Sequence, residues 1–270
     1  MPQPTASRSD LATALAATRF REVRWFASLD STNRYLADEA VAGAAPGLVV
    51  VADEQTAGRG RLGRTWIAPP GASLLASVLL DGDDVGAVDE RHLALIAAAL
   101  AAVDAVDAHC GFRPRLKWPN DLVVGDRKLA GLLAETTATH SIVVGMGLNV
   151  EWDSFPPELE STATACNREG RPVPREELLV TWLRGFDQRL RMLAEGGPAT
   201  LRSDHLAASA TLGRRVRIER ARDTFEGEAI ALTDLGHLVV RTAGSDDTAG
   251  THSVDHTVSA GDVIHLRPIG

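Results

Sequence analysis

Apolar residues in the first 210 positions recur either in short runs or at helical spacing. Helical spacing is clearest over Asp89–His109, where Leu93, Ile96, Ala97, Leu100 and Val103 would share one face. Further helices are predicted from Asp10 to Thr18, from Ser31 or Thr32 to Gly43, and over 174–194 and 198–208. Short runs predict strands over 22–27, 48–52, 72–80, 115–118, 122–124, 128–135 and 142–144. Gly125-Asp126 predicts a tight hairpin turn, and residues 151–173 a loop.

The pattern changes near Leu212, where short alternating segments separated by Gly and Asp turns begin. These segments predict strands at residues 215–219, 225–229, 238–241 and 263–266. Such spacing is typical of a small all-β barrel. We therefore expect an N-terminal extension with a helix at 1–20, a mixed α/β body at 21–211 and a β domain at 212–270.

The composition restricts the binding partners and the cellular compartment that we expect for this protein. The net charge of −8 disfavours general binding of nucleic acid, which needs a broad basic face. Cys110 and Cys166 have no paired spacing and suit a reducing compartment. No apolar signal segment is visible at the N-terminus, and the apolar run from Leu93 to Val103 is too short to span a bilayer. His252 and His256 are four residues apart, but the Gly, Thr and Ser residues around them do not predict the helix that would align them as metal ligands. We expect a cytoplasmic protein with no membrane or DNA partner.

One loop departs from this acidic background, the run from Gly58 to Arg64, in which three arginines alternate with glycines. Exposed backbone N–H groups and guanidinium forks bind anions such as phosphate or carboxylate. The run fits G-x-G-x-x-G and nearly fits the P-loop pattern, but both require a helix immediately afterwards. Pro69-Pro70-Gly71 would end such a helix within two turns. We therefore reject both templates and expect an anion-binding loop, with a merely basic surface loop as the alternative.

Other polar clusters lie at or near expected strand ends. They are Ser31-Thr32-Asn33, Gln55, Lys117-Trp118-Pro119-Asn120-Asp121, Lys128 with Gly131, and Gly147 with Asn149. Singly, each has a structural explanation, such as a helix cap, a turn or a solvated lysine. Together they offer hydrogen bonds to a neutral head group and positive charge for two anions. No Ser-His-Asp or Cys-His pairing is evident, so the pattern favours activation of a carboxylate by ATP without a covalent enzyme intermediate.

These motifs resemble the biotin protein ligase family in sequence and order. The resemblance rests on 28–33 (Ser-Leu-Asp-Ser-Thr-Asn), 55–61 (Gln-Thr-Ala-Gly-Arg-Gly-Arg), 117–121, 127–131 (Arg-Lys-Leu-Ala-Gly) and 145–149 (Gly-Met-Gly-Leu-Asn), and it runs from about residue 22 to the C-terminus. It implies an α+β fold, in which a mixed-sheet domain similar to class II synthetases precedes a small SH3-like β-barrel. It also implies that ATP activates biotin as biotinyl-5′-AMP, which a lysine of a biotin carboxyl carrier domain then attacks.

The resemblance also implies roles for individual residues. Biotin would contact Ser31, Thr32, Asn33, Gln55, Arg59, Gly60, Arg61, Lys128 and Gly131. ATP or the adenylate would contact Arg59, Arg61, Arg64, Trp66, Lys117, Asn120, Asp121, Lys128 and Asn149. Catalysis would rest on Lys128, Arg61 and Asp121, with Asp121 also a ligand of Mg²⁺. The enzyme would act as a monomer or weak homodimer.

Two departures from the family pattern bear on function. Leu62 stands where relatives often have another arginine, so one phosphate-facing charge is absent there. Only about twenty residues precede the first expected strand, whereas some members carry an N-terminal winged-helix domain, so we expect no repressor function. The rival interpretations are a lipoate or octanoate ligase or transferase, which shares the carrier-lysine acceptor, and a noncatalytic binding module. The Arg/Gly loop favours biotin.

Overall fold

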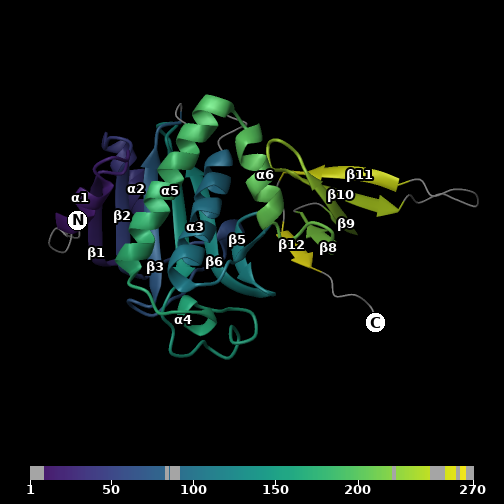
Figure 1. Cartoon of the computed structure of the whole chain (residues 1–270), viewed down its shortest axis with the longest axis horizontal. Coiled ribbons are helices and arrows are strands. Elements are labelled where there is room, and N and C mark those ends of the chain that lie inside the picture. Colours follow the sequence, from purple (N-terminus) through teal and green to yellow (C-terminus); the bar gives the residue numbers. More distant parts are fainter. Residues whose placement is uncertain are drawn as a thin grey trace, which may run out of the picture.

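A seven-stranded mixed sheet in the order β1-β2-β3-β7-β6-β5-β4 forms the centre of the larger part of the protein (Figure 1). The computed structural model describes residues 9–82, 85, 92–220, 223–243, 253–259 and 262–265. β1 and β2 pair in parallel, and the other neighbours are antiparallel. The strands are β1 Glu22–Leu29, β2 Leu48–Gln55, β3 Ser73–Leu80, β4 Arg115–Lys117, β5 Asp121–Val124, β6 Arg127–Thr136 and β7 Ile142–Asn149. Each expected strand of this region is confirmed, as is the hairpin turn between β5 and β6, where Gly125 has a φ of 61°.

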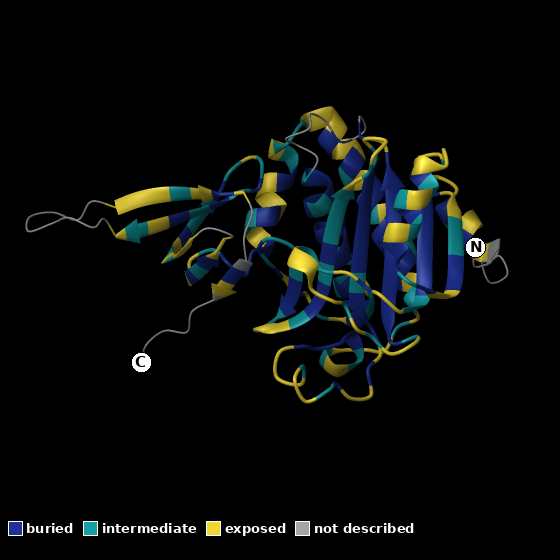
Figure 2. Cartoon of the chain, turned by 180° about the vertical axis from the view of Figure 1, so that it is seen from behind, coloured by how far each residue is buried: buried dark blue, intermediate teal, exposed yellow. Residues whose placement is uncertain are grey.

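Helices cover both faces of this sheet. They are α1 Ser9–Leu15, α2 Thr32–Val41, α3 Leu93–Cys110, α4 Cys166–Glu169, α5 Arg175–Gly196 and α6 Ala199–Ala208. The strand period of two decides which side chains meet which helices. Val49 and Val51 of β2 join the core under α3 and α5, whereas Val50 and Ala52 join the smaller core under α2. The strands are consequently buried over most of their length (Figure 2).

Helix α3 is apolar enough, and at 18 residues long enough, to cross a membrane by composition alone. This corrects the expectation from the shorter Leu93–Val103 run. However, 72% of the helix is buried inside the protein, where it packs against α5. It is therefore a core helix of the main domain.

The C-terminal strands form a separate five-stranded antiparallel sheet in the order β11-β10-β9-β8-β12. They are β8 Arg215–Glu219, β9 Thr224–Leu232, β10 Leu238–Ala243, β11 Ser253–Val258 and β12 Asp262–His265. α6 lies between this sheet and the main body (Figure 1). The α+β fold class is confirmed. Strand β11 was not expected, because Val258 is its one buried residue and the strand has little apolar pattern.

Three local expectations need correction. The loop expected at 151–173 contains the short helix α4. α1 ends at Leu15, and the Thr18 hydroxyl donates to the Leu15 carbonyl at 2.8 Å instead of continuing the helix. Asp10 was expected to cap α1, but it lies inside the helix as an acidic residue of the first turn. The expected start of the long helix at Asp89 lies outside the described residues.

Candidate active site

Strand register brings distant motifs together on one face of the main sheet. Asp121 of β5 pairs with Gly131 of β6, and Gly131 pairs in turn with Gly147 of β7. On the same face, Ser77 of β3 pairs with Gly145. Because paired residues point to the same side of a sheet, these positions form one continuous surface. This surface is the floor of the site.

A cavity of about 280 Å³ lies over this floor. It is lined by the predicted residues Ser31, Thr32, Asn33, Gln55, Arg59, Gly60, Arg61, Arg64, Trp66, Lys117, Asn120, Asp121, Lys128 and Gly131. Each sequence cluster thus reaches the same cavity from its own strand end or loop. Such convergence of motifs on one cavity is the usual sign of a ligand site.

Asn149 is the exception among the predicted residues, because it is not one of the residues that line this cavity. Its Oδ1 accepts from the Ser73 hydroxyl at 3.2 Å, and its Nδ2 donates to the Thr164 carbonyl at 3.0 Å. The side chain is buried, and it is absent from the residues that line the cavity. Asn149 holds the segment after β7 in place.

One end of the cavity offers neutral hydrogen-bonding groups at the start of α2. Ser31 caps this helix, because its side chain accepts from the Arg34 backbone N–H. Thr32 donates to Gln55 Oε1 twice, from its backbone N–H at 2.7 Å and from its hydroxyl at 2.9 Å. This arrangement fixes the Gln55 amide. The helix cap and the polar end of the cavity are therefore the same structure.

The other end of the cavity is cationic. The Lys128 ammonium lies 2.8 Å from Asp121 Oδ1 and 5.6 Å from the centre of the Trp66 ring. Arg61 donates to Asn120 Oδ1 at 3.4 Å, and the Asn120 Nδ2 donates to the Leu132 carbonyl at 2.6 Å. These contacts orient positive charge toward the space beside the neutral end.

The Arg/Gly loop folds back on itself above the cavity. The Gly60 N–H donates to the Arg64 carbonyl at 2.7 Å, and a short 3₁₀ turn covers Arg61–Gly63. Leu62 in that turn has a φ of 55°, a region that branched and bulky residues seldom adopt. No α-helix follows the loop within the described residues 56–72, so rejecting the two phosphate-loop templates is right.

Two glycines of the floor make room for Trp66. A Cβ at Gly147 would lie 2.6 Å from the Trp66 ring, and one at Gly131 would lie 3.2 Å from it. The ring therefore lies directly on the strands. Its Nε1 is buried and hydrogen-bonds to nothing among the described residues. An orphaned buried donor beside a cavity points to a ligand acceptor.

The C-terminal domain completes the wall, which the sequence motifs did not indicate. Glu219 at the end of β8 and Val263 and Ile264 of β12 line the same cavity. The predicted run 117–121 touches that domain through Trp118, whose side chain is buried with apolar residues of the small sheet. Thr65, Leu132, Leu133, Gly145, Met146 and Gly147 also line the cavity. Ser77 was also missed by the sequence analysis. A polar residue on a buried face of β3 could have indicated that this face carries the site.

The metal-ligating side chains of the cavity are few, so they would bind a metal ion only weakly. No group of three or more His, Cys, Asp or Glu residues suited to a metal occurs in the described part of the chain. Asp121 and Glu219 are carboxylates that line the cavity. Mg²⁺ commonly binds one or two carboxylates together with substrate phosphates and keeps several waters. The site therefore fits Mg²⁺ that arrives with a nucleotide, but not a permanently bound ion.

The protein combines a synthetase-like α+β domain with a cavity that is neutral at one end and cationic at the other. This combination is expected of a ligase that activates a carboxylic acid. Residues 25–149 match the model of the biotin/lipoate A/B protein ligase family, and residues 211–266 that of the biotin protein ligase C-terminal domain. The biotin–[acetyl-CoA-carboxylase] ligase of Mycobacterium tuberculosis is 37% identical over 93% of this chain and 92% of its own length. The bifunctional ligase/repressor of Bacillus spizizenii is 31% identical over 79% of this chain and 67% of its own.

Solved structures agree on the fold. The biotin protein ligase of Aquifex aeolicus, solved with biotin and ATP, gives a TM-score of 0.79 at 23% identity, over 92% of this chain and 100% of that one. That of Leishmania major, solved with biotinyl-5-AMP, gives 0.59 at 25% identity, over 88% and 99%. The chain belongs to the biotin protein ligase family, and it is a ligase.

Proposed function

We propose that this ligase activates biotin with ATP as biotinyl-5′-AMP and then transfers the biotinyl group to a lysine of a biotin carboxyl carrier domain. The observation that carries the proposal is the cavity itself, where a neutral hydrogen-bonding end adjoins a cationic end. Biotin has the matching shape, a neutral cyclic urea at one end and a carboxylate at the other. The name of the M. tuberculosis relative supports an acceptor in acetyl-CoA carboxylase.

In the first step a biotin carboxylate oxygen attacks the α-phosphorus of ATP. The bond from that phosphorus to the bridging oxygen breaks, and pyrophosphate leaves with the electron pair. Lys128 and Arg61 would stabilise the charge on both anions, each well-placed donor contributing about 3–4 kcal/mol. Holding the two reactants together contributes about 7–11 kcal/mol in favourable cases.

The pair between Lys128 and Asp121 prepares the cationic end. The 2.8 Å contact holds the ammonium over the floor before any anion arrives. When bound with ATP, Mg²⁺ would supply charge neutralisation at the phosphates, and Asp121 and Glu219, which both line the cavity, would hold it. Lys117 and Arg64 line the same region and would bind phosphate oxygens.

The Arg/Gly loop is proposed as a lid over the adenylate. A mixed anhydride is hydrolysed by water, so the enzyme must cover it until the acceptor arrives. Arg59 and Arg61 lie in this loop and line the cavity, and the glycines between them permit the chain to move. Trp66 lies at the end of the loop and would form the wall beside the adenine.

In the second step the neutral amine of the acceptor lysine attacks the carbonyl carbon of the anhydride. The bond from that carbon to the phosphate oxygen breaks, AMP leaves, and the amine loses its proton to solvent. We also propose that the enzyme works in the cytoplasm as a monomer or weak homodimer. The proposed division remains at residues 1–20, 21–211 and 212–270.

Pyrophosphate release tests the first step separately from transfer. The protein is incubated with ATP and Mg²⁺, and with biotin, lipoate or neither acid. We expect rapid pyrophosphate release and isolable biotinyl-5′-AMP with biotin alone. Release with lipoate and not with biotin would assign the lipoate branch of the family instead. No pyrophosphate release with either acid would indicate a noncatalytic binding module.

A further inference from the structure

Ser77 lies behind the neutral end of the cavity, on the face of β3 that carries the site. It is fully buried, and its Oγ lies 2.7 Å from both Thr32 Oγ1 and Asn33 Oδ1. Gly145 faces it across the strand pair, and a Cβ there would lie 2.0 Å from Asn33 Oδ1. The missing side chain of Gly145 thus leaves the space in which Ser77 and Asn33 meet.

The direction of each hydrogen bond at Thr32 follows from chemistry. A backbone N–H can only donate, so the Gln55 atom 2.7 Å from Thr32 N must be the amide oxygen. That oxygen accepts only, so the Thr32 hydroxyl, 2.9 Å away, must give it its single hydrogen. Thr32 Oγ1 is then left with lone pairs and needs a donor.

Asn33 Oδ1 also needs a hydrogen-bond donor, and Ser77 is the hydroxyl beside it. Its Nδ2 donates to the Glu135 carboxylate at 2.8 Å, so its Oδ1 is the atom that faces Ser77. An amide oxygen can only accept. Ser77 therefore has one hydrogen, while Thr32 Oγ1 and Asn33 Oδ1 both require one.

We infer that Ser77 is a positioning residue: its hydrogen bond to Asn33 holds the start of α2, and with it Thr32, in place, so that Thr32 Oγ1 can accept from an N–H of the bound acid. This inference rests on the proposed function. The cyclic urea of biotin carries two N–H groups, and one of them would satisfy Thr32. The dithiolane ring of lipoate has none, so one buried acceptor would stay without a donor. Sites built to hydrogen-bond a group discriminate strongly against analogues that lack it.

The first test separates binding from chemistry. Ser77→Ala should raise KM for biotin about tenfold, the upper range for one lost hydrogen bond, with kcat changed less than about twofold. Ser73→Ala is the matched control. Ser73 lies on the same strand and face and is equally buried, but it bonds Asn149 and Trp152. The control should lower stability and leave KM unchanged.

Equal KM values for the wild type and Ser77→Ala, or equal shifts in the two serine variants, would overturn the inference. In a Thr32→Val background, Ser77→Ala should add less than about a twofold change, since the two residues act together. A full tenfold addition would contradict that coupling.

A second test needs no variant. Biotin with both urea nitrogens methylated should bind the wild-type enzyme at least about a hundredfold more weakly than biotin. Equal binding would overturn the role of Thr32 as an acceptor. Failure of the wild type to activate biotin at all would instead refute the proposed function, so the two failures are distinguishable.

Discussion

The indole Nε1 of Trp118 donates a 2.9 Å hydrogen bond to the carbonyl oxygen of Gly236, in the turn between β9 and β10. Trp118 belongs to the 117–121 run of the cavity wall, yet its ring is buried in the core of the C-terminal sheet. Gly236 in turn fits closely on α3, since a Cβ there would lie 2.3 Å from Ile96 Cδ1. The small domain therefore helps to hold the active-site wall.

Trp118→Ala should therefore damage stability and catalysis together. Truncating a buried tryptophan typically costs about 3–5 kcal/mol of unfolding free energy. We expect chemical denaturation to show a loss of that order, with a fall in the rate of pyrophosphate release because Asn120 and Asp121 lose their support. Trp118→Phe keeps most of the volume and loses the donor, so it should cost less. An unchanged unfolding curve for Trp118→Ala would contradict the interdomain role.

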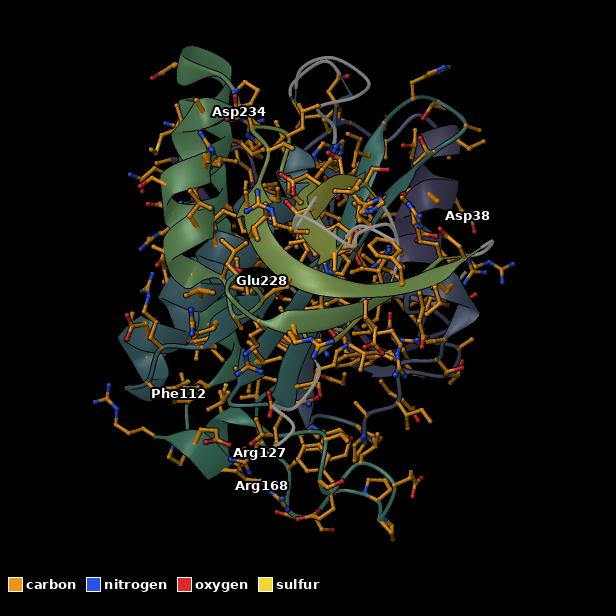
Figure 3. All side chains as sticks on the ribbon, turned by 90° about the vertical axis from the view of Figure 1, so that its right-hand side faces the viewer. Asp38, Phe112, Arg127, Arg168, Glu228 and Asp234 are labelled. Carbon is orange, nitrogen blue, oxygen red and sulfur yellow. The ribbon has the colours of Figure 1, made fainter. Side chains whose placement is uncertain are left out.

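Lys128→Ala should suppress adenylate formation by at least about a hundredfold, comparable to removing one strong transition-state donor. The neighbouring Arg127→Ala is the control, because Arg127 pairs with Glu169 at 2.7 Å outside the cavity. Figure 3 shows Arg127 next to Arg168 in the lower part of the view. Initial rates of pyrophosphate release measure both. Near-normal release from Lys128→Ala would remove Lys128 from the first step.

Arg61→Gly should allow adenylate synthesis to continue in part while the intermediate escapes. The variant loses the 3.4 Å contact with Asn120 that fixes the loop over the cavity. Biotinyl-5′-AMP in solution, separated by filtration and quantified, gives the leakage. Leu62→Gly adds equal backbone freedom without removing a charge, because the Leu62 side chain is exposed. Leakage no greater from Arg61→Gly than from Leu62→Gly would count against the proposed lid.

Gly147→Ala should weaken nucleotide binding, because the added methyl would lie 2.6 Å from the Trp66 ring and force it off the sheet. We expect a several-fold higher KM for ATP and a change in tryptophan fluorescence. Gly185→Ala in α5 is the control, since its Cβ would meet Ala101 Cβ at an ordinary 3.4 Å. A normal KM in Gly147→Ala would show that Trp66 does not serve ATP.

Acid should destabilise the folded protein through His205 of α6, which is buried near Gly236 of the small domain. Burial, with a smaller contribution from the charge of His92, lowers the pKa of His205 from 6.5 to about 4. Between these values the unfolded chain binds more protons than the folded one, so the free energy of unfolding falls as pH falls from 6.5 to 4. The loss from this residue is of the order of 3 kcal/mol and is absent above pH 6.5. His205→Gln should flatten this part of the profile in denaturation between pH 4 and 7, and an unchanged slope would contradict the assignment.

The sequence predicted the elements and most of the cavity because both follow local rules. Strand periodicity and turn chemistry located β1 to β7, and the unusual Arg/Gly run indicated an anion site. The contacts of Asn149 were not predicted, because spacing places a residue near a strand end but does not show which neighbours its side chain will bond. Here the side chain bonds Ser73 and Thr164.

Long-range packing was beyond the sequence patterns. Trp118 was expected at the end of a strand, and only the tertiary structure shows it in the core of the other domain. Ser77 lies between apolar residues of β3, so the sequence did not show the role of its hydroxyl until Thr32 and Asn33 were found beside it. The contributions of Glu219, Val263 and Ile264 depend on docking of the C-terminal sheet.

The intact mass of an acceptor tests the central claim most directly. A biotin carboxyl carrier domain is incubated with the protein, ATP, Mg²⁺ and an equimolar mixture of biotin and lipoate. The account predicts a mass increase of one biotinyl group, dependent on ATP and lost when the acceptor lysine is replaced by arginine. A lipoyl increment, or an unmodified acceptor in the presence of active protein, would contradict it.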